Sequence, residues 1–392
     1  MTILQDYTQF TGRHYETGSL HNVLSYQGHD ISEALLLGIS GGITLGYFSF
    51  AYEGYDPHIA LLTRNTFDPF DTLLQRLGIV QDVRQSAKPD IAQKNLLDVL
   101  ESGRPALVWV DMFSLPYTLS AHSDDMWLMI PVLVYGHDGD TVHLADRAGV
   151  ALTMPAADFM AARGVSKKHR YKLLAVDDVN MQRLSSAVEQ GLHDTIKLFS
   201  GDVPVKQAAK SMGYAGMTRW ADCLTKRSDR QSWQKVFPLG PKLYAGLHTT
   251  FASIEVNNGP GAERARFADC LEAAADLLNR PTLKTIASDY RALAQRWSAL
   301  ADAHLPDSVP AFAEARDLLR RDIALFIEQG QAAQSEREGI RDRLREIRAQ
   351  MDDDFPLSED DATALRQQLA EQVLALRDAE QEQINALQAA LN

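Results

Sequence analysis

Strand patterns are confined to the first half of the chain, and this asymmetry is the feature that most constrains its fold. Short apolar runs typical of strands occur at 106–111, 131–136, 141–146 and 171–176. Helical patterns occur around them, at about 17–27, 31–38, 70–78, 89–102 and 155–163. Beyond about residue 180, helical periodicity alone continues to the end of the sequence. Strands and helices segregated in this way predict an α+β fold rather than a doubly wound parallel sheet.

The segment PVLVYGHDGDTVHLAD (131–146) predicts an antiparallel hairpin, because two apolar strands flank a turn with Asp138, Gly139 and Asp140. The glycine-rich segment GISGGITLGY (38–47) follows a helix and lacks the lysine of a phosphate-binding loop. We therefore interpret 38–47 as a loop in which backbones approach closely. No segment of the sequence indicates a cofactor.

The change of pattern also predicts the domain organisation. A chain of 392 residues exceeds one typical core. We expect a mixed domain at 1–178, an all-helical domain at 179–330 and an amphipathic helical hairpin at 331–392. The apolar stripe of this hairpin comprises Ile340, Leu344, Ile347, Met351, Leu365, Leu369, Leu376, Ile384, Leu387 and Leu391. Ser358 and Asp361 fit a capping box at the start of the last helix. The hairpin either packs on its own domain, which is the more common arrangement, or pairs two subunits as a homodimer.

The composition favours a soluble cytoplasmic protein. Acidic residues outnumber basic ones by 52 to 39, and the net charge of −13 argues against a nucleic-acid partner. No apolar run approaches membrane-spanning length, and MTILQDYTQF lacks the pattern of a secretory signal. The two cysteines, Cys223 and Cys270, are expected to be buried thiols.

Four segments, in this order and spacing, resemble the butirosin biosynthesis protein H family. They are GRHYETGSLHNVLSYQG (12–28), SEALLLGISGGITLGYFSF (32–50), VWVDMFSLPY (108–117) and VLVYGHDGDTVHLADR (132–147). In the helical half, GMTRWADCL, LYAGLHTTFASIE and GPGAERARFADCLEAAADLL resemble the companion domain of that family. The resemblance covers about residues 8–305 and implies a papain-like N-terminal domain followed by an all-helical domain. The final hairpin lies outside it.

The resemblance implies transfer of an acyl group from an acyl-carrier-protein thioester to an amine during natural-product assembly. In that pattern a cysteine accepts the acyl group, a histidine activates it, and an Asp or Asn orients the histidine. Here the cysteine position corresponds to Tyr15, beside His14, and the histidine position corresponds to Ile130. Only the third position is retained, as Asp146. A tyrosine hydroxyl, with a reference pKa near 10, is a poor acyl acceptor at pH 7.

His14 and His122 are the remaining candidate bases, and Asp124 or Asp125 would orient His122. The alternatives are that His14 is a structural residue beside a glycine turn and that the cluster around His122 faces solvent. A metal site formed by His122, His137 and nearby aspartates is the weaker hypothesis, because no ligand pair has the spacing of a zinc motif. We expect no metal.

Four residues in the matching segments are candidate substrate-binding residues: Glu33, Tyr117, Arg147 and Arg264. Glu33 is expected to line the pocket near Tyr15, and the alternative is a first-turn glutamate that complements the helix dipole. Arg264 is expected to hold a phosphate or carboxylate of a ligand, and the alternative is an interdomain salt bridge.

Three hypotheses about function remain open at this point. The chain transfers an acyl or aminoacyl group with altered catalytic residues, such as Tyr15 with His14 or His122. Alternatively, it is a catalytically silent member of the fold that binds a carrier-protein-linked intermediate or an active partner enzyme. A third hypothesis is a structural protein whose helical tail assembles subunits. Loss of both the cysteine and its histidine argues against conventional covalent catalysis, whereas the retained motifs argue against a collapsed site.

Overall fold

The computed structural model describes residues 2–119 and 127–392, and its contacts divide the chain into two compact units. The first, here called the sheet unit, comprises the chain up to Leu36 together with Leu73–Leu184 and Ala324–Glu338. The second, the helical unit, comprises Leu37–Thr72, Ser185–Ile323 and Gly339–Asn392. Both units are therefore built from interleaved segments. The ranges 1–178, 179–330 and 331–392 stay a prediction about domain limits.

The sheet unit contains a seven-stranded sheet in the order β4-β9-β5-β6-β7-β8, with β1 also pairing with β6. Every pairing among these strands is antiparallel. The strands are β1 (Thr2–Ile3), β4 (Val80–Arg84), β5 (Ala106–Asp111), β6 (Met129–His137), β7 (Thr141–Ala145), β8 (Leu152–Pro155) and β9 (Leu173–Asp178). The predicted hairpin is confirmed as β6 and β7, and every residue of β5 is buried. The α+β class is confirmed.

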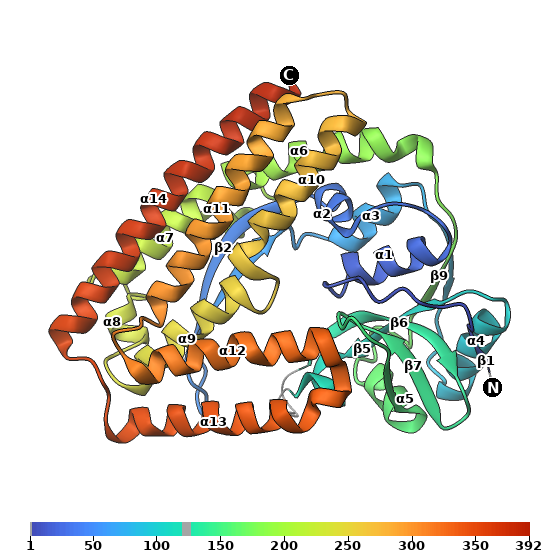
Figure 1. Ribbon diagram of the computed structural model, residues 1–392, viewed down its shortest axis with the longest axis horizontal. Helices are drawn as coiled ribbons and strands as arrows, with labels where there is room; N and C mark the ends of the chain where they lie inside the picture. Colours follow the sequence, from blue (N-terminus) through green and yellow to red (C-terminus); the bar gives the residue numbers. More distant parts are fainter. Residues whose placement is uncertain (1, 120–126) are drawn as a thin grey trace. The chain divides into compact units, whose positions relative to one another are not determined.

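Helices complete the sheet unit, and one of them carries the start of the candidate site. They are α1 (Thr17–Tyr26), α4 (Pro89–Glu101), α5 (Ala156–Gly164) and the short turns η1 (Met112–Ser114), η2 (Pro116–Thr118) and η3 (Met181–Arg183). The apolar residues Leu20, Val23 and Leu24 of α1 are buried, and α1 packs against β6 (Figure 1). This packing fixes the residues that precede α1 relative to the sheet.

The helical unit begins with a hairpin that the sequence patterns did not predict. Strand β2 (Ile43–Phe50) pairs with β3 (His58–Arg64) in a separate two-stranded antiparallel sheet. The interpretation of 38–47 as a loop is therefore wrong from Ile43 onward. Close backbone approach does occur just before it, since Gly41 and Gly42 have φ values of 104° and 66°, a region that favours glycine. Figure 1 shows the hairpin among the helices of this unit.

The rest of the helical unit consists mainly of helices, and several of these helices continue into the sheet unit. They are α2 (Glu33–Ile39), α3 (Pro69–Arg76), α6 (Leu184–Ser200), η4 (Lys206–Ser211), α7 (Gly213–Thr225), α8 (Trp233–Val236), α9 (Pro241–Glu255), η5 (Pro260–Glu263), α10 (Arg264–Leu277), α11 (Thr282–His304), α12 (Pro310–Gln329), η6 (Gly330–Ala333), α13 (Gln334–Asp353) and α14 (Glu359–Leu391). Helical structure from about residue 180 onward is thus confirmed.

The end of the chain forms two consecutive helices, α13 and α14, and their arrangement as a hairpin stays a prediction. Ser358 caps α14 by accepting a hydrogen bond from the Asp361 backbone N–H at 3.1 Å, and Asp361 accepts one from the Ser358 N–H, which confirms the capping box. The leucine stripe of α14 is buried, and α14 packs against α7 and α11 of the same unit. This burial agrees with packing inside the chain. A homodimer through other surfaces of these helices stays a prediction.

Candidate functional site

Tyr15 lies in the turn directly before α1, close to the position that the family pattern predicts. His14 is buried, and its Nδ1 accepts a hydrogen bond from the Glu16 backbone N–H at 3.3 Å. The rings of His14 and Tyr15 are tilted against each other with centroids 4.0 Å apart. Tyr15 itself is half-buried. The residue at the family's cysteine position is thus held by its neighbour and retains an accessible side.

Glu33 anchors this turn from the first residue of α2. Its Oε2 accepts a hydrogen bond from the Arg13 backbone N–H at 2.9 Å, and its Oε1 accepts one from the His14 backbone N–H at 2.9 Å. The Thr17 hydroxyl also donates to Oε1, at 3.0 Å. Charged acceptors bind backbone N–H groups strongly when buried. Glu33 therefore positions the residues around Tyr15, which lies within the span that it ties down.

Asp146 and Arg147 directly follow β7 and pair with each other. Arg147 donates from Nε to Asp146 Oδ1 at 2.8 Å and from Nη2 to Oδ2 at 2.9 Å, a bidentate ion pair. Arg147 has a φ of 54°, which is uncommon and costly for a residue with a side chain. Burial would lower the pKa of Arg147, but the negative charge of Asp146 raises it above its ordinary value. Both carboxylate oxygens of the expected histidine orienter thus bind an arginine.

The turn before α1 and the turn after β7 lie next to each other. Arg13 donates from Nη1 to the backbone carbonyl of Arg147 at 3.4 Å, and the phenol of Tyr15 lies near enough to Arg147 to interact with its charge. Ile130, which the resemblance aligns with the histidine position, is 1% exposed and pairs with Val110 on β5. Arg147 thus links the two turns, through its ion pair with Asp146 and the hydrogen bond that its carbonyl accepts from Arg13.

Tyr117 is buried near Asp146, and a distant segment covers it. It is fully buried in η2, and burial together with the nearby Asp146 charge raises the pKa of its hydroxyl. Its ring stacks on Phe326 with centroids 6.0 Å apart, and the Arg147 guanidinium lies 5.8 Å from the Phe326 ring. Arg337 donates to the Tyr117 backbone carbonyl at 2.6 Å and lies over Phe326 at 4.9 Å. Phe326 and Arg337 thus belong to the surroundings of the site.

Local sequence patterns gave no signal for these two residues, because they lie about two hundred positions beyond Tyr117 in the sequence. Two further contacts hold this segment on the sheet unit. The Gly149 N–H donates to the Ile327 carbonyl at 2.7 Å, and Gln331 exchanges hydrogen bonds with the backbone of Thr153 at 2.7 Å. The segment Ala324–Glu338 is therefore an integral part of the sheet unit.

Arg264 does not join this cluster. Arg264 has no exposed surface and belongs to the helical unit, where it donates from Nε to Glu380 at 2.6 Å. Its other donors bind the backbone carbonyls of Ala262 and Thr44, and Trp297 lies beneath its guanidinium at 4.8 Å. This arrangement favours the ion-pair alternative, inside one unit rather than between domains. His122, Asp124 and Asp125 lie outside the described residues.

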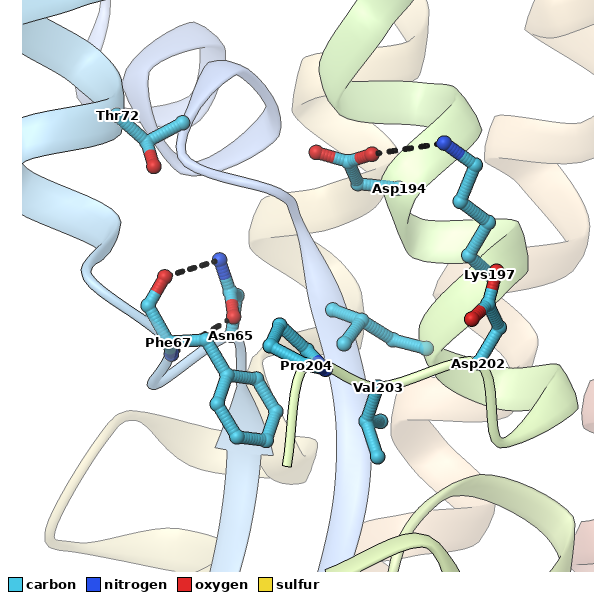
Figure 2. Close-up of a pocket in the computed structure, with 9 residues that line it drawn as sticks. Asn65, Phe67, Thr72, Asp194, Lys197, Asp202, Val203 and Pro204 are labelled. Carbon is cyan, nitrogen blue, oxygen red and sulfur yellow. Dashed lines mark hydrogen bonds and ion pairs between the residues drawn. The ribbon is translucent and has the colours of Figure 1, made fainter. Parts of the chain in front are cut away.

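A separate cavity of about 360 Å³ opens in the helical unit (Figure 2). Its lining includes Phe67, Val203 and Pro204 as apolar surface, with Asp194 and Lys197 at 3.6 Å from each other on α6. The Asn65 amide donates to the Ser40 carbonyl at 2.6 Å and accepts from the Phe67 N–H at 2.9 Å. None of the residues singled out from the sequence lines this cavity.

The two cysteines are buried in the helical unit. Cys223 and Cys270 are both buried, as predicted, and burial raises the pKa of the Cys270 thiol to about 12. The pKa of Cys223 is raised for the same reason. Within residues 2–119 and 127–392, no three His, Cys, Asp or Glu side chains gather as metal ligands. In the same residues, no helix combines the length and apolar character needed to cross a membrane.

Residues 14–147 match the family described as butirosin biosynthesis protein H, N-terminal. The resemblance carried by the sequence motifs is thereby confirmed over this range, which includes Tyr15, Glu33, Tyr117, Asp146 and Arg147. No curated protein matches the chain.

Proposed function

Because residues 14–147 match the butirosin biosynthesis protein H family, we propose that this protein acts in natural-product assembly by binding an acyl or aminoacyl intermediate without forming an acyl-enzyme. Under this proposal the sheet unit has the papain-like arrangement of the family. The intermediate arrives as a thioester on a carrier protein, and its acyl end lies beside Tyr15.

The ion pair between Asp146 and Arg147 is the observation that carries this proposal. An acyl transferase of this type needs a nucleophile, a base and a group that orients the base, and these act as a unit. Here a phenol replaces the thiol, a buried isoleucine replaces the base, and the orienting carboxylate is held by an arginine in two hydrogen bonds. The two buried cysteines are unsuitable substitutes, because burial keeps their thiols protonated.

The organisation of the turn before α1 supports a site that still binds a ligand rather than a site that has lost all function. The buried carboxylate of Glu33 makes three hydrogen bonds to residues 13, 14 and 17, and the half-buried ring of Tyr15 lies between them. A turn that is held in this way presents one aromatic face at low cost in conformational entropy. Tyr15 is therefore the residue expected to contact the acyl chain.

Intact-protein mass spectrometry after incubation with an acyl-pantetheine thioester tests the absence of covalent chemistry. We expect the thioester to bind with saturation and to leave the protein mass unchanged. Tyr15→Ala should weaken binding by about tenfold, through loss of the aromatic contact. Tyr52→Ala is the matched control, since Tyr52 is 59% exposed and lies in the helical unit. An acyl adduct on any side chain would refute the proposal.

A second experiment restores the missing groups. In Tyr15→Cys the new thiol would lie near the Arg147 cation, which favours the thiolate. We expect this thiol to react with iodoacetamide at a lower pH than the thiol of Tyr52→Cys. Adding Ile130→His should increase acyl transfer to the introduced thiol by more than either single change predicts. If neither variant is labelled faster than the wild type, the site is closed to thioesters and the proposed function fails.

A further inference from the structure

A loop of positive charge lies between α5 and β9 of the sheet unit. Lys167, Lys168, Arg170 and Lys172 occur within six residues, and no acidic residue interrupts them. Lys167, Lys168 and Arg170 are exposed, and Lys172 is half-buried. We call these four residues the basic loop. In a chain with a net charge of −13, such a concentration of one sign is unexpected.

The four side chains of the basic loop lack acidic partners in the part of the chain that the structure describes. Among the described residues, none of its four side chains has a carboxylate within ion-pair distance. In the helical unit, by contrast, Arg291 pairs with both Asp269 and Glu272, and Arg343 pairs with Glu314 and Glu346. The positive charge of the loop is therefore directed to solvent.

Buried groups hold the backbone of the loop in one conformation. Arg163 of α5 is fully buried and donates to the Tyr171 carbonyl at 2.9 Å, while its guanidinium lies 5.8 Å from the Tyr171 ring. The Ser86 N–H donates to the Arg170 carbonyl at 2.9 Å. Arg170 and Tyr171 have φ values of 48° and 51°, two consecutive left-handed residues without glycine. Strain of this kind persists only where the surroundings enforce it, and it often marks functional segments.

One further lysine extends the charged surface. Lys88 is exposed, lies two residues after Ser86, and has no carboxylate partner among the described residues, although Asp90 follows it closely in sequence. Lys172 lies 4.2 Å from the centroid of the Trp109 ring. Trp109 is on β5 and pairs with Pro131, the residue after Ile130. The basic loop is thus connected through one strand pair to the strand that carries the lost histidine position.

From this arrangement we infer that the basic loop, with Lys88, is a docking surface for an acidic face of a partner protein. Clustered charges of one sign on a rigid loop attract and orient a partner of opposite charge. This inference rests on the proposed function in one respect: the acidic partner is then the carrier protein that delivers the intermediate. The five charges are too few, and the rest of the chain too acidic, to favour a nucleic acid.

Binding of a negatively charged holo acyl carrier protein and of poly-L-glutamate to the full chain tests the inference. We expect both probes to bind, and both affinities to fall at least tenfold between about 50 mM and about 500 mM NaCl, because salt screens exposed charges. Lys167→Glu with Lys168→Glu should weaken binding of both probes by about tenfold. Lys167→Ala with Lys168→Ala should have a smaller effect in the same direction.

The matched control is Lys206→Glu with Lys210→Glu, which changes the net charge equally at two exposed lysines of the helical unit. We expect this control to bind both probes within about twofold of the wild type. An equal loss in the control would show attraction to total charge rather than to the loop, and would overturn the inference. Absence of wild-type binding to both probes would also overturn it.

Two further measurements separate alternative outcomes. If a single-stranded oligonucleotide or phosphatidylserine vesicles bind the loop more tightly than the carrier protein, the surface serves another class of ligand and the inference is wrong. The affinity for acyl-pantetheine should stay unchanged in Lys167→Glu with Lys168→Glu, because this small molecule lacks the acidic protein surface that would bind the loop. Failure of acyl-pantetheine to bind the wild type, with carrier binding intact, would reject the proposed function and leave the docking surface standing.

Discussion

At the scale of single residues, Glu33 shows how a buried charge can serve position rather than chemistry. The sequence indicated two roles for it, a complement to the helix dipole and a pocket residue. Its location at the first residue of α2 fits the first, and its three hydrogen bonds to residues 13, 14 and 17 add a role in holding the turn. One carboxylate thus stabilises two helix starts at once.

Glu33→Gln removes the charge and replaces one acceptor oxygen by a donor, so the turn before α1 should loosen. We expect the free energy of unfolding to fall by about 1–3 kcal/mol, the usual cost of an unsatisfied buried group. Urea denaturation measures this change, and proteolysis at residues 13–16 should become faster. Glu382→Gln, at an exposed position of α14, is the control and should leave stability unchanged. Equal stability of both variants would remove Glu33 from its anchoring role.

His304 makes a prediction about pH. It is fully buried at the end of α11, its Nδ1–H donates to the Leu300 carbonyl at 2.8 Å, and its ring stacks on Trp220. Burial lowers the pKa of His304 to about 4, whereas in the unfolded chain it has its ordinary value near 6.5. Between these two values the unfolded state binds more protons, so stability is full above pH 6.5 and falls as the pH drops toward 4.

We therefore expect His304 to account for a loss of about 2 kcal/mol in the free energy of unfolding between about pH 6.5 and about pH 5. Unfolding in urea at the two pH values measures it. His304→Gln should be less stable at pH 7 but should show a smaller loss on acidification. An identical pH dependence in the wild type and the variant would show that other groups govern it.

The scale of helices and strands shows where sequence patterns succeed. Apolar alternation and the turn residues predicted β5 and the β6–β7 hairpin, and the leucine spacing predicted the buried face of α14. The same reasoning missed β2, because Gly46 interrupts its alternation and its first five residues are all buried. It also missed β3, β4 and β8. None of the residues of β4 is buried and β8 has only four residues, so neither strand gives a clear apolar alternation.

Some residues of the candidate site could be singled out from the sequence, and others could not. The family motifs singled out Tyr15, Asp146 and Tyr117, which local pattern alone does not do, and their role stays a prediction. Phe326 and Arg337 could not be predicted from the sequence. They contact η2 from about two hundred residues away, and such a contact does not change the local pattern of either segment. Arg264 was singled out because its segment resembles the companion domain of the family, but its buried ion pair with Glu380 joins residues 116 positions apart and leaves no local pattern.

The capping box of α14 provides a prediction at this scale. Ser358→Ala removes the side-chain acceptor for the Asp361 N–H, and we expect a loss of about 1 kcal/mol in the free energy of unfolding. Hydrogen exchange of the first amides of α14 should become faster. Ser358→Asp restores a capping acceptor and should recover most of the loss. If alanine exchanges no faster than serine, packing against α7 and α11 alone fixes the start of the helix.

At the scale of the whole molecule, each unit is built from three separate stretches of the chain, which alternate along the sequence. The hairpin of β2 and β3 belongs to the helical unit, although the strands before and after it belong to the sheet unit. Conversely, the turn between α12 and α13 belongs to the sheet unit. Each unit therefore depends on residues from distant parts of the chain.

A fragment of residues 1–178 tests this dependence, since it corresponds to the predicted N-terminal domain. It lacks Phe326, Gln331 and Arg337 and carries β2 and β3 without their helices. We expect broad, non-cooperative unfolding of this fragment in urea, with Tyr117 exposed to solvent, because several buried faces lose their cover. A folded monomer with a sharp transition would show that the first domain is self-sufficient.

The position of Ala324–Glu338 also has a consequence during synthesis on the ribosome. The strands of the sheet unit emerge first, but the residues that cover Tyr117 are translated only after α6 to α11 have been made. The apolar surface around Tyr117 therefore stays uncovered in the nascent chain until most of the chain has left the exit tunnel. Chaperones that bind apolar surfaces would act on this protein in that interval, and a pause in translation before residue 324 would lengthen it.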